Sequence, residues 1–317
     1  MTRLLHCSFH RGCFEDLRFI CNKLSIELEE FTPSEHGVYN IGHDRAKRLW
    51  EKHKDYFNSF DIIFTSDTTP LSRIFLQNDF KNKLVIWVSN RFDYFDGASL
   101  DCNFPDEEYY DLLRSIEFRP NVTIISNTLV EIYYANSKNV SLGTRIIKPV
   151  GKKLYHKECY DISNIFRVPR YHNETIMMNL SKKLNDMGIP STDDRFLDGE
   201  YEKTKGVICI PYAYLTWALF ESFAHGVIYF VPSFEFLLEI SKTPNFWFQP
   251  PFSPETLRMS EWYNDDHKDL FVYYNSWEDL KYKTENLDYT KQKKKINDFY
   301  KIHEENTLRQ WKEVLTL

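Results

Sequence analysis

The chain has 317 residues, 42% hydrophobic and 16% aromatic, which is enough for two domains with their own cores and too apolar for a disordered protein. Its formal net charge of −6 argues against a nucleic-acid-binding protein that relies on bulk positive charge. Six scattered cysteines without a C-x-x-C pair, and no apolar signal segment before the first predicted strand, argue against a disulfide framework and indicate a reducing, cytoplasmic compartment.

Short β-branched runs alternate with amphipathic segments through the first half of the chain. Strands are expected at residues 3–9, 25–31, 61–67, 83–92, 121–127 and 144–151. Helices are expected between them, at residues 16–24, 44–57, 71–80, 106–118 and 129–137. This order predicts a parallel, doubly wound sheet, because right-handed crossovers place helices on both of its faces.

A polar stretch at residues 152–164 interrupts this alternation and marks the expected domain boundary. We therefore expect a Rossmann-like domain at residues 1–152 and a second at residues 153–317. The second half resumes the pattern with a strand at residues 165–170 and a helix at 174–189. It ends in a charged helix, residues 290–316, that could return to the first domain.

The most apolar stretch, residues 211–233, contains one acid, Glu221, one histidine, His225, and one glycine, Gly226. A membrane span is excluded, because a carboxylate and an imidazole are costly near its middle. A buried strand–helix–strand unit is expected instead, with strands at residues 206–211 and 227–231 and a helix at 213–224. Gly226 should adopt the left-handed conformation that ends this helix. Glu221 then lies on a helix against a sheet, where an acid needs a partner or a ligand.

Ligands of doubly wound sheets bind where the strands end, so the residues of the strand–helix turns form the candidate site. They are His10, Arg11, Gly12, Asp67, Thr68, Thr69, Ser89, Asn90, Arg91, Phe92, Asp93, Arg170, His172, Asn173 and Glu221. Gly12 lets the backbone approach an anion at a helix N-terminus, and Arg170 can pair with a phosphate. A carboxylate such as Glu221 suits the two hydroxyls of a ribose. Phosphate and ribose together indicate a nucleotide.

Several nucleotide and metal motifs are missing from the sequence. It has neither the G-x-G-x-x-G of dinucleotide dehydrogenases nor the Walker lysine loop, which argues against hydride transfer and ATP hydrolysis. It also lacks His-Glu-x-x-His, clustered Cys and His, and the G-x-S-x-G elbow. The acidic pairs at residues 193–194 and 265–266 are interpreted as solvated loops, so neither a metal nor another cofactor is expected.

Four short segments resemble those of GT-B fold glycosyltransferases, closest to the retaining glycosyltransferase family 4. "ESFAHGVIYFVPS", which begins at Glu221, resembles the family's "EAMACGxPVV", whose acid binds the nucleotide ribose. "VPRY" is similar to "VGRL", whose arginine grips the donor diphosphate and corresponds to Arg170. "IKPVG" resembles the "IPNG" that closes the first domain, and "HRG" places Gly12 in the family's glycine-rich first loop. The Tyr-, Phe-, Asn- and Lys-rich composition suits a virus-encoded member of the chlorovirus type.

The resemblance implies two Rossmann-like domains that face each other across a cleft. It implies transfer of a hexose from a nucleotide sugar to a hydroxyl of a glycan or glycoprotein, as in protein glycosylation, with retained anomeric configuration and without a metal. GDP-mannose is the favoured donor and a UDP-hexose the next. The expected partners are this donor and acceptor, without a nucleic acid or a membrane span, and a homodimer is compatible with these expectations.

The sequence departs from the family's pattern at several positions. Ala213 stands where the first acid of an E-x7-E pattern is usual, so the region of Tyr214 is expected to bind the transferred sugar instead. Thr175 stands where a lysine usually follows the arginine, and Lys152 or Lys153 is the suggested replacement.

The family's histidine after the fourth strand is replaced by the region of Ser89 and Asn90. The candidate catalytic residues are accordingly Asn90, Arg91 and Asp93. Asp67 and Asp93 could activate an acceptor hydroxyl, but a role as helix caps is the favoured interpretation for both.

Two other classes of protein remain open. A sugar-nucleotide epimerase or phosphorylase on the same architecture would act without an acceptor, and an epimerase would need acids or histidines placed for proton abstraction. A non-catalytic protein would bind the nucleotide sugar or a glycan without turnover. Simpler interpretations also remain for single residues: Glu221 as a salt-bridge partner, Arg170 as a surface arginine, His225 as a helix-end residue and Gly12 as a turn residue.

Overall fold

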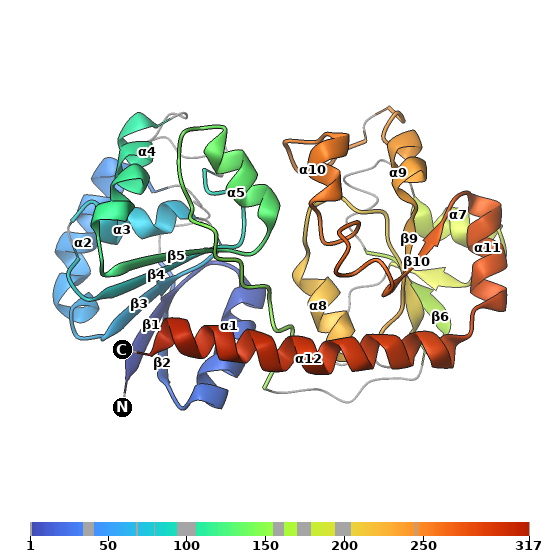
Figure 1. Ribbon diagram of the computed structural model, residues 1–317, viewed down its shortest axis with the longest axis horizontal. Coiled ribbons are helices and arrows are strands. Elements are labelled where there is room, and N and C mark those ends of the chain that lie inside the picture. The colour runs from blue at the N-terminus through green and yellow to red at the C-terminus, as the bar shows by residue number, and fades with distance from the viewer. Residues whose placement is uncertain are drawn as a thin grey trace. The chain divides into compact units, whose positions relative to one another are not determined.

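The computed structural model describes residues 2–33, 41–67, 69–78, 80–93, 106–154, 162–169, 179–193, 204–244 and 246–316. Its internal contacts divide the chain into two compact units (Figure 1). Unit 1 comprises Met1–Pro149 and Asn306–Leu317, and unit 2 comprises Val150–Glu305. The last helix, α12 (Tyr289–Leu315), therefore begins in unit 2 and ends in unit 1.

Unit 1 contains a parallel five-stranded sheet in the order β2-β1-β3-β4-β5. Its strands are β1 (Arg3–Cys7), β2 (Glu27–Phe31), β3 (Ile62–Thr65), β4 (Lys83–Val88) and β5 (Val122–Ser126). Cys7 pairs with Phe31 on one side and with Thr65 on the other, so the order of the strands reverses between β1 and β3. Doubly wound sheets bind their ligands at such a switch point.

Helices cover both faces of the unit 1 sheet. They are α1 (Arg11–Leu24), α2 (His43–Phe57), η1 (Thr69–Ser72), α3 (Arg73–Leu76), α4 (Glu107–Arg114), η2 (Ser115–Phe118) and α5 (Leu129–Asn136). On one face, Trp311 from α12 packs against Phe64 and Trp87. Phe14 from α1 contacts His6 of β1. The other face carries the apolar residues of α2, α3, α4 and α5, so the alternating side chains of each strand fill two cores.

Unit 2 also contains a parallel five-stranded sheet, in the order β10-β9-β8-β6-β7. Its strands are β6 (Ile162–Arg167), β7 (Ser191–Thr192), β8 (Thr204–Ile208), β9 (Tyr229–Pro232) and β10 (Phe271–Tyr274). Its helices are α7 (Leu180–Asp186), α8 (Trp217–Ala224), α9 (Phe234–Ile240), α10 (Pro254–Arg258), α11 (Trp277–Asn286) and the first part of α12. The two sheets confirm the predicted fold class of two doubly wound α/β units.

Helices also cover both faces of the unit 2 sheet. Tyr229 points toward α8, and its hydroxyl donates to Ala218 O at 3.3 Å. On the opposite face, Tyr274 contacts Phe236 of α9 and Trp277 of α11. Strands buried on both sides explain why this half of the sequence contains continuous apolar runs.

The prediction of a sixth strand at residues 144–151 is wrong. Ser126 N donates to Arg145 O, and Ile147 N donates to Ser126 O, each at 3.0 Å, so this fully described segment makes a single bridge to β5. Pro149 has no N–H and cannot extend the ladder. The segment is apolar because it packs against the sheet, as where Trp87 Nε1 donates to Ile147 O at 3.1 Å.

The helix predicted from residue 213 begins at Trp217 instead. The carbonyl groups of Ala213 and Tyr214 accept hydrogen bonds from Trp262 Nε1 at 2.7 Å and from Glu261 N at 2.9 Å. These carbonyls would otherwise accept the first bonds of the helix, so the tertiary contacts shorten it.

The predicted end of this helix is confirmed. Gly226 has a φ of +64°, and its N–H donates to Phe223 O at 3.1 Å. Val227 N donates to Ser222 O at 2.9 Å, which completes a Schellman motif. Among the described residues, no helix is both long and apolar enough to cross a membrane.

Candidate functional site

The carboxyl edge of the unit 1 sheet connects polar residues from four strand ends. Ser66 Oγ, after β3, donates to Ser8 Oγ, after β1, at 3.0 Å. Ser89 Oγ, after β4, accepts from Asp67 N at 2.8 Å. Asn127 Nδ2, after β5, donates to Ser89 O at 3.1 Å. Parallel strands thus bring distant turns together at the switch point, as their order predicts.

His6 lies one residue before the end of β1 and is fully buried. Its Nε2 is 2.7 Å from Ser66 Oγ, and because that hydroxyl donates to Ser8, the histidine must donate from Nε2–H. Nδ1 is then an acceptor, and it has no hydrogen-bond partner among the residues that the structure describes. Burial lowers the pKa of His6 to about 3, so the ring remains neutral. The sequence-based prediction omitted His6 because it lies inside an apolar strand.

Asp67 follows Ser66 and has a φ of +71°, in the left-handed region that residues other than glycine rarely adopt. Its side chain is buried, and Asn90 hydrogen-bonds to its carboxyl group. Oδ2 has no partner in the described part of the chain, and the interpretation of Asp67 as a helix cap stays a prediction. Burial raises the pKa of Asp67 to about 7, and the hydrogen bond from Asn90 offsets part of this rise. Backbone strain and a perturbed acid occur together at functional sites.

Glu131, in the first turn of α5, is a second buried acid, and the sequence-based prediction omitted it as well. Its N–H donates to Thr128 Oγ1 at 3.4 Å, whereas its Oε2 has no partner among the described residues. Burial, and then the charge of Asp93, raise the pKa of Glu131 to about 8, against the opposing effects of Arg91 and of Phe92 N–H. The signal available in the sequence was its place in the first turn of the helix that follows the fifth strand.

Buried polar atoms without a hydrogen-bond partner gather at this edge. Within the described residues, six such atoms lie at or just after the strand ends: His6 Nδ1, Thr65 Oγ1, Asp67 Oδ2, Thr69 Oγ1, Ser126 Oγ and Glu131 Oε2. Tyr274 Oη and Trp311 Nε1 are further such atoms elsewhere in the described chain. An unpaired buried polar group costs about 1–3 kcal/mol. Several unpaired atoms near one edge make this edge the candidate for binding a polar ligand, although the atoms lie on both faces of the sheet.

The predicted catalytic residues Asn90, Arg91 and Asp93 all lie in the turn after β4. Asp93 is buried and accepts from Arg91 Nε at 2.9 Å, Tyr110 Oη at 2.8 Å and Tyr134 Oη at 2.9 Å. Asn90 Oδ1 accepts from Arg91 N at 2.8 Å. Both carboxyl oxygens of Asp93 are occupied, which supports an anchoring role for it, and the catalytic role of all three residues stays a prediction.

Asp106, and not Asp93, caps α4, the next helix that the structure describes, so the interpretation of Asp93 as a helix cap has no support at α4. Asp106 Oδ1 accepts from Tyr109 N at 3.1 Å at the start of α4. The donors to Asp93 come instead from Arg91 in its own turn and from tyrosines of α4 and α5. Asp93 thus ties this turn to two helices.

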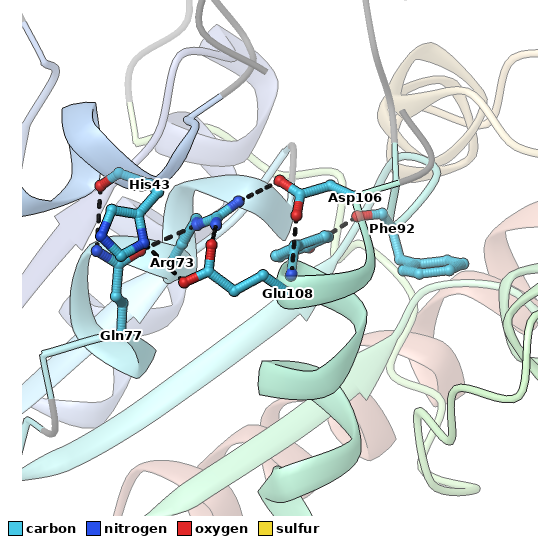
Figure 2. Close-up of polar contacts among 7 residues, drawn as sticks. His43, Arg73, Gln77, Phe92, Asp106 and Glu108 are labelled. Carbon is cyan, nitrogen blue, oxygen red and sulfur yellow. Dashed lines mark hydrogen bonds and ion pairs between the residues drawn. The ribbon is translucent and has the colours of Figure 1, made fainter. Parts of the chain in front are cut away.

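Arg73 is another buried charged residue of unit 1, but all three of its guanidinium nitrogens are used. Nε donates to Gln77 Oε1 at 3.0 Å, Nη2 donates to Glu108 Oε2 at 2.6 Å, and Nη1 donates to Asp106 (Figure 2). His43 Nδ1 lies 2.6 Å from the other oxygen of Glu108. This network joins α2, α3 and α4. Because each guanidinium nitrogen of Arg73 has a partner, we interpret the network as structural.

Gly12, predicted to contact the donor, is the second residue of α1. His10 caps this helix, since its Nδ1 accepts from Cys13 N at 3.3 Å. Gly12 therefore lies at a helix N-terminus, the kind of position that binds anions. It belongs to unit 1, whereas the other predicted donor-binding residues belong to unit 2, and its role stays a prediction.

In unit 2, Glu221 lies in α8 and pairs with Lys153, whose Nζ is 3.4 Å from Glu221 Oε2. The side chains are 15% and 17% exposed. Gly151, two residues before the lysine, has a φ of +77°, and a Cβ there would lie 2.3 Å from Phe220 C and 2.6 Å from Glu221 N. Only glycine permits this contact with the backbone of α8. Two of the segments quoted from the sequence, "IKPVG" and "ESFAHG", thus meet.

The two lysines suggested as replacements have different partners. Lys152 Nζ lies 2.6 Å from Glu304 Oε2 and also lies over the ring of Tyr300, at 5.4 Å from its centroid. Lys153 alone is next to Glu221, so the geometry favours Lys153 for the predicted donor site.

Two further predicted donor-binding residues have different outcomes. Tyr214 is buried; its hydroxyl donates to Thr256 Oγ1 at 3.0 Å and its ring contacts Phe248. These contacts occupy its side chain with packing. Arg170, with His172 and Asn173, lies outside the described residues.

The described residues hold no group of three or more His, Cys, Asp or Glu side chains arranged to bind a metal ion. Four of the six cysteines are described, namely Cys7, Cys13, Cys21 and Cys209, and each is a buried free thiol.

No protein-family model matches the sequence, and no curated protein matches it significantly. Among solved structures, CalG4, the calicheamicin glycosyltransferase, is similar with a TM-score of 0.46 and 10% identity over 99% of this chain and 98% of that chain. A UDP-N-acetylglucosamine 2-epimerase from Listeria monocytogenes, described as putative, has a TM-score of 0.40 and 11% identity over 73% of this chain and 79% of that chain. An S. aureus MnaA–UDP structure has a TM-score of 0.41, 10% identity and the same coverage. At TM-scores below 0.5, these structures do not indicate the ligand or the chemistry of this chain. Both have to be inferred from its own residues.

Proposed function

We propose that this chain is a glycosyltransferase that moves a hexose from a nucleotide sugar to a hydroxyl of a glycan or glycoprotein. GDP-mannose is the favoured donor and a UDP-hexose the next, as the resemblance of the sequence implies. The resemblance also implies retention, independence of a metal and a cytoplasmic location, and these stay predictions.

The observation that supports this proposal best is the arrangement of Gly151, Lys153 and Glu221 in unit 2. A carboxylate suits the ribose hydroxyls, and a lysine beside it offers a positive charge to the diphosphate. An ordinary salt bridge would need neither the left-handed glycine nor its contact with the backbone of α8. The close contact keeps the lysine against the acid, and both side chains remain partly exposed for a ligand.

Calorimetric titration with a panel of nucleotide sugars and free nucleotides, with and without EDTA, tests the donor site. We expect one nucleotide sugar to bind with micromolar affinity and independently of EDTA. Glu221→Ala should weaken binding about tenfold to a hundredfold, because hydrogen bonds to a charged group contribute about 1.5–3 kcal/mol. Glu285→Ala, at an exposed position of α11, serves as the control and should bind like the wild type. Wild-type protein that binds nothing in the panel would overturn the proposal.

Gly151→Ala tests the scaffold of this site separately from its charges. The added methyl group would collide with the backbone at Phe220, so Lys153 and α8 must separate and donor binding should weaken as much as in Glu221→Ala. Gly143→Ala is the matched control, because Gly143 has a φ of +68° but a Cβ there would meet nothing within 4 Å. Equal binding by the two glycine variants would show that the contact with α8 is irrelevant to the ligand.

A sugar-nucleotide epimerase is the second candidate, and the buried acids of unit 1 favour it. Asp67 and Glu131 have raised pKa values, of about 7 and about 8, as acids that exchange protons near neutral pH require. An epimerase would change the configuration of the nucleotide sugar without an acceptor. Proton NMR of the donor incubated with the protein alone separates the two activities.

A further inference from the structure

The carboxyl group of Asp67 is fixed in position with one oxygen available for a ligand. Ser89 Oγ accepts from its backbone N–H at 2.8 Å, and Asn90 hydrogen-bonds to its carboxyl group. Oδ2 has no partner among the described residues, although the side chain is only 5% exposed. The φ of +71° places this group at the switch point at a cost in backbone strain.

Apart from Arg11, whose 74% exposed side chain pairs with Glu15 at 3.7 Å, the groups of β1 and α1 near this turn carry little charge. His6 is neutral, because burial lowers its pKa to about 3. The buried thiol of Cys13 lies 3.6 Å from Ser89 Oγ, and His10 accepts from Cys13 N through Nδ1. None of these groups supplies a positive charge to Asp67.

Within the described residues, the turn after β4 and helix α5 also offer no unpaired cation to a ligand. Arg91 is bound to Asp93 at 2.9 Å, so the two charges compensate each other. Glu131 is buried, with its pKa raised to about 8, and is mostly protonated at neutral pH. Among the described residues, Asp67 Oδ2 is a buried acceptor without a partner, and a hydroxyl group of a neutral ligand would satisfy it.

We infer that Asp67 is the base that takes the proton from the attacking hydroxyl of the acceptor. This inference rests on the proposed transfer from a nucleotide sugar. As the acceptor oxygen bonds to the anomeric carbon, the bond from that carbon to the diphosphate oxygen breaks and its electron pair leaves with the nucleoside diphosphate. The hydroxyl proton passes to Asp67 Oδ2 and is later released to water. Burial raises the pKa of Asp67 to about 7, which suits a base that works near neutral pH.

A base held by the protein has a consequence for stereochemistry. It acts on the acceptor in a single displacement, in which the hydroxyl attacks opposite the leaving diphosphate and the anomeric configuration inverts. In a retaining transfer, the leaving diphosphate can itself accept the proton, so that no carboxylate base from the protein is needed. Asp67 therefore points to inversion, in place of the retention that the resemblance implies.

Rates of nucleoside diphosphate release test this role between pH 5 and pH 9, with GDP-mannose or the nucleotide sugar that titration selects. Methyl glycosides serve as acceptors, and water serves as the acceptor where none of them reacts. We expect kcat/KM of the wild type to rise with pH and level off above about pH 7. Asp67→Asn should lower it about 10²- to 10⁴-fold and remove this rise, with donor affinity unchanged within about twofold. Asp55→Asn, at an exposed position of α2, should behave like the wild type.

The outcomes separate this inference from the proposed function. Turnover by Asp67→Asn at the wild-type rate and with the wild-type pH profile would overturn the role of Asp67 and leave the glycosyltransferase proposal standing. A product of retained configuration would do the same. A wild-type chain that binds no nucleotide sugar, or binds one and releases no nucleoside diphosphate, would overturn both. Inverted product from the wild type and a stable, donor-binding, inactive Asp67→Asn variant would support it.

Discussion

Arg73 and Asp67 are both buried charged residues of unit 1 and both follow β3, yet their surroundings differ. Arg73 is 1% exposed, and its guanidinium group donates to Gln77, Asp106 and Glu108. Asp67 is 5% exposed, and one of its carboxyl oxygens has no hydrogen-bond partner in the described chain. Removing a partner from a complete buried network is costly, whereas an acid buried without full pairing itself reduces stability.

The backbone shows the same difference. Arg73 begins the regular helix α3, whereas Asp67 has a positive φ. Strain and an unsatisfied charge persist only where the surrounding structure enforces them, and such positions cluster at functional sites. Burial alone therefore does not distinguish a structural charge from a functional one; hydrogen-bond satisfaction and backbone conformation do.

The largest effect on stability should come from Arg73→Met. The substitution keeps the volume of the side chain but leaves Asp106 and Glu108 without their counter-charge, so we expect a loss of about 3 kcal/mol. Urea unfolding followed by tryptophan fluorescence measures it. Arg114→Met is the control, because Arg114 pairs with Glu107 and Asp111 at the surface of the same unit and should lose less than about 1 kcal/mol. Equal losses in the two variants would remove the contrast between Arg73 and an ordinary surface arginine.

Asp67→Asn should raise the free energy of unfolding, and by less than Arg73→Met lowers it. The pKa of Asp67 is about 7 in the folded protein and 3.8 ordinarily, so the folded state binds a proton that the unfolded state has lost over this range. Ionisation therefore reduces stability progressively as pH rises from about 4 to about 7. Asparagine tolerates the left-handed conformation and removes this penalty. One pKa unit corresponds to about 1.4 kcal/mol of stability. The buried amide of the asparagine lacks a partner, and this cost offsets part of the stabilisation. A net gain of about 2 kcal/mol at pH 8 is expected.

Denaturation at two pH values checks the cause of this gain. The advantage of Asp67→Asn should fall by about 2 kcal/mol between pH 8 and pH 5, because the folded carboxyl group is then protonated. Asp55→Asn should show no such dependence. If Asp67→Asn stabilises the protein equally at both pH values, the pKa of Asp67 is not raised in the folded protein. That result would count against its role as a base.

Most of the fold could be predicted from the sequence, because buried parallel strands and amphipathic helices produce local patterns. The errors arose where tertiary contacts decide the structure. Residues 144–151 are apolar enough for a strand but pack against the sheet through Ile147. The start of α8 depends on the carbonyls of Ala213 and Tyr214, which accept from residues about 50 positions later in the chain.

The candidate site was partly predictable. Glu221 lies in a recognisable segment, and its neighbour Lys153 was suggested, although the glycine contact that joins them is visible only in three dimensions. Asp67 was selected by its place after a strand but interpreted as a cap. His6 and Glu131 were omitted, because a histidine in an apolar strand and an acid in a first helical turn are ordinary locally. Whether a buried oxygen has a partner cannot be read from a sequence pattern.

The smallest expected effect concerns Asp93, which lies between the two extremes. It is buried like Asp67 but paired like Arg73, with donors from Arg91, Tyr110 and Tyr134. Tyr134→Phe removes one donor of the three and should reduce stability by about 1 kcal/mol. Tyr282→Phe, at a residue of α11 that is 64% exposed, is the control and should change it by less than about 0.5 kcal/mol. A stable Tyr134→Phe variant that retains transfer activity would assign Asp93 to anchoring, whereas a stable variant that loses activity would return Asp93 to the catalytic set predicted from the sequence.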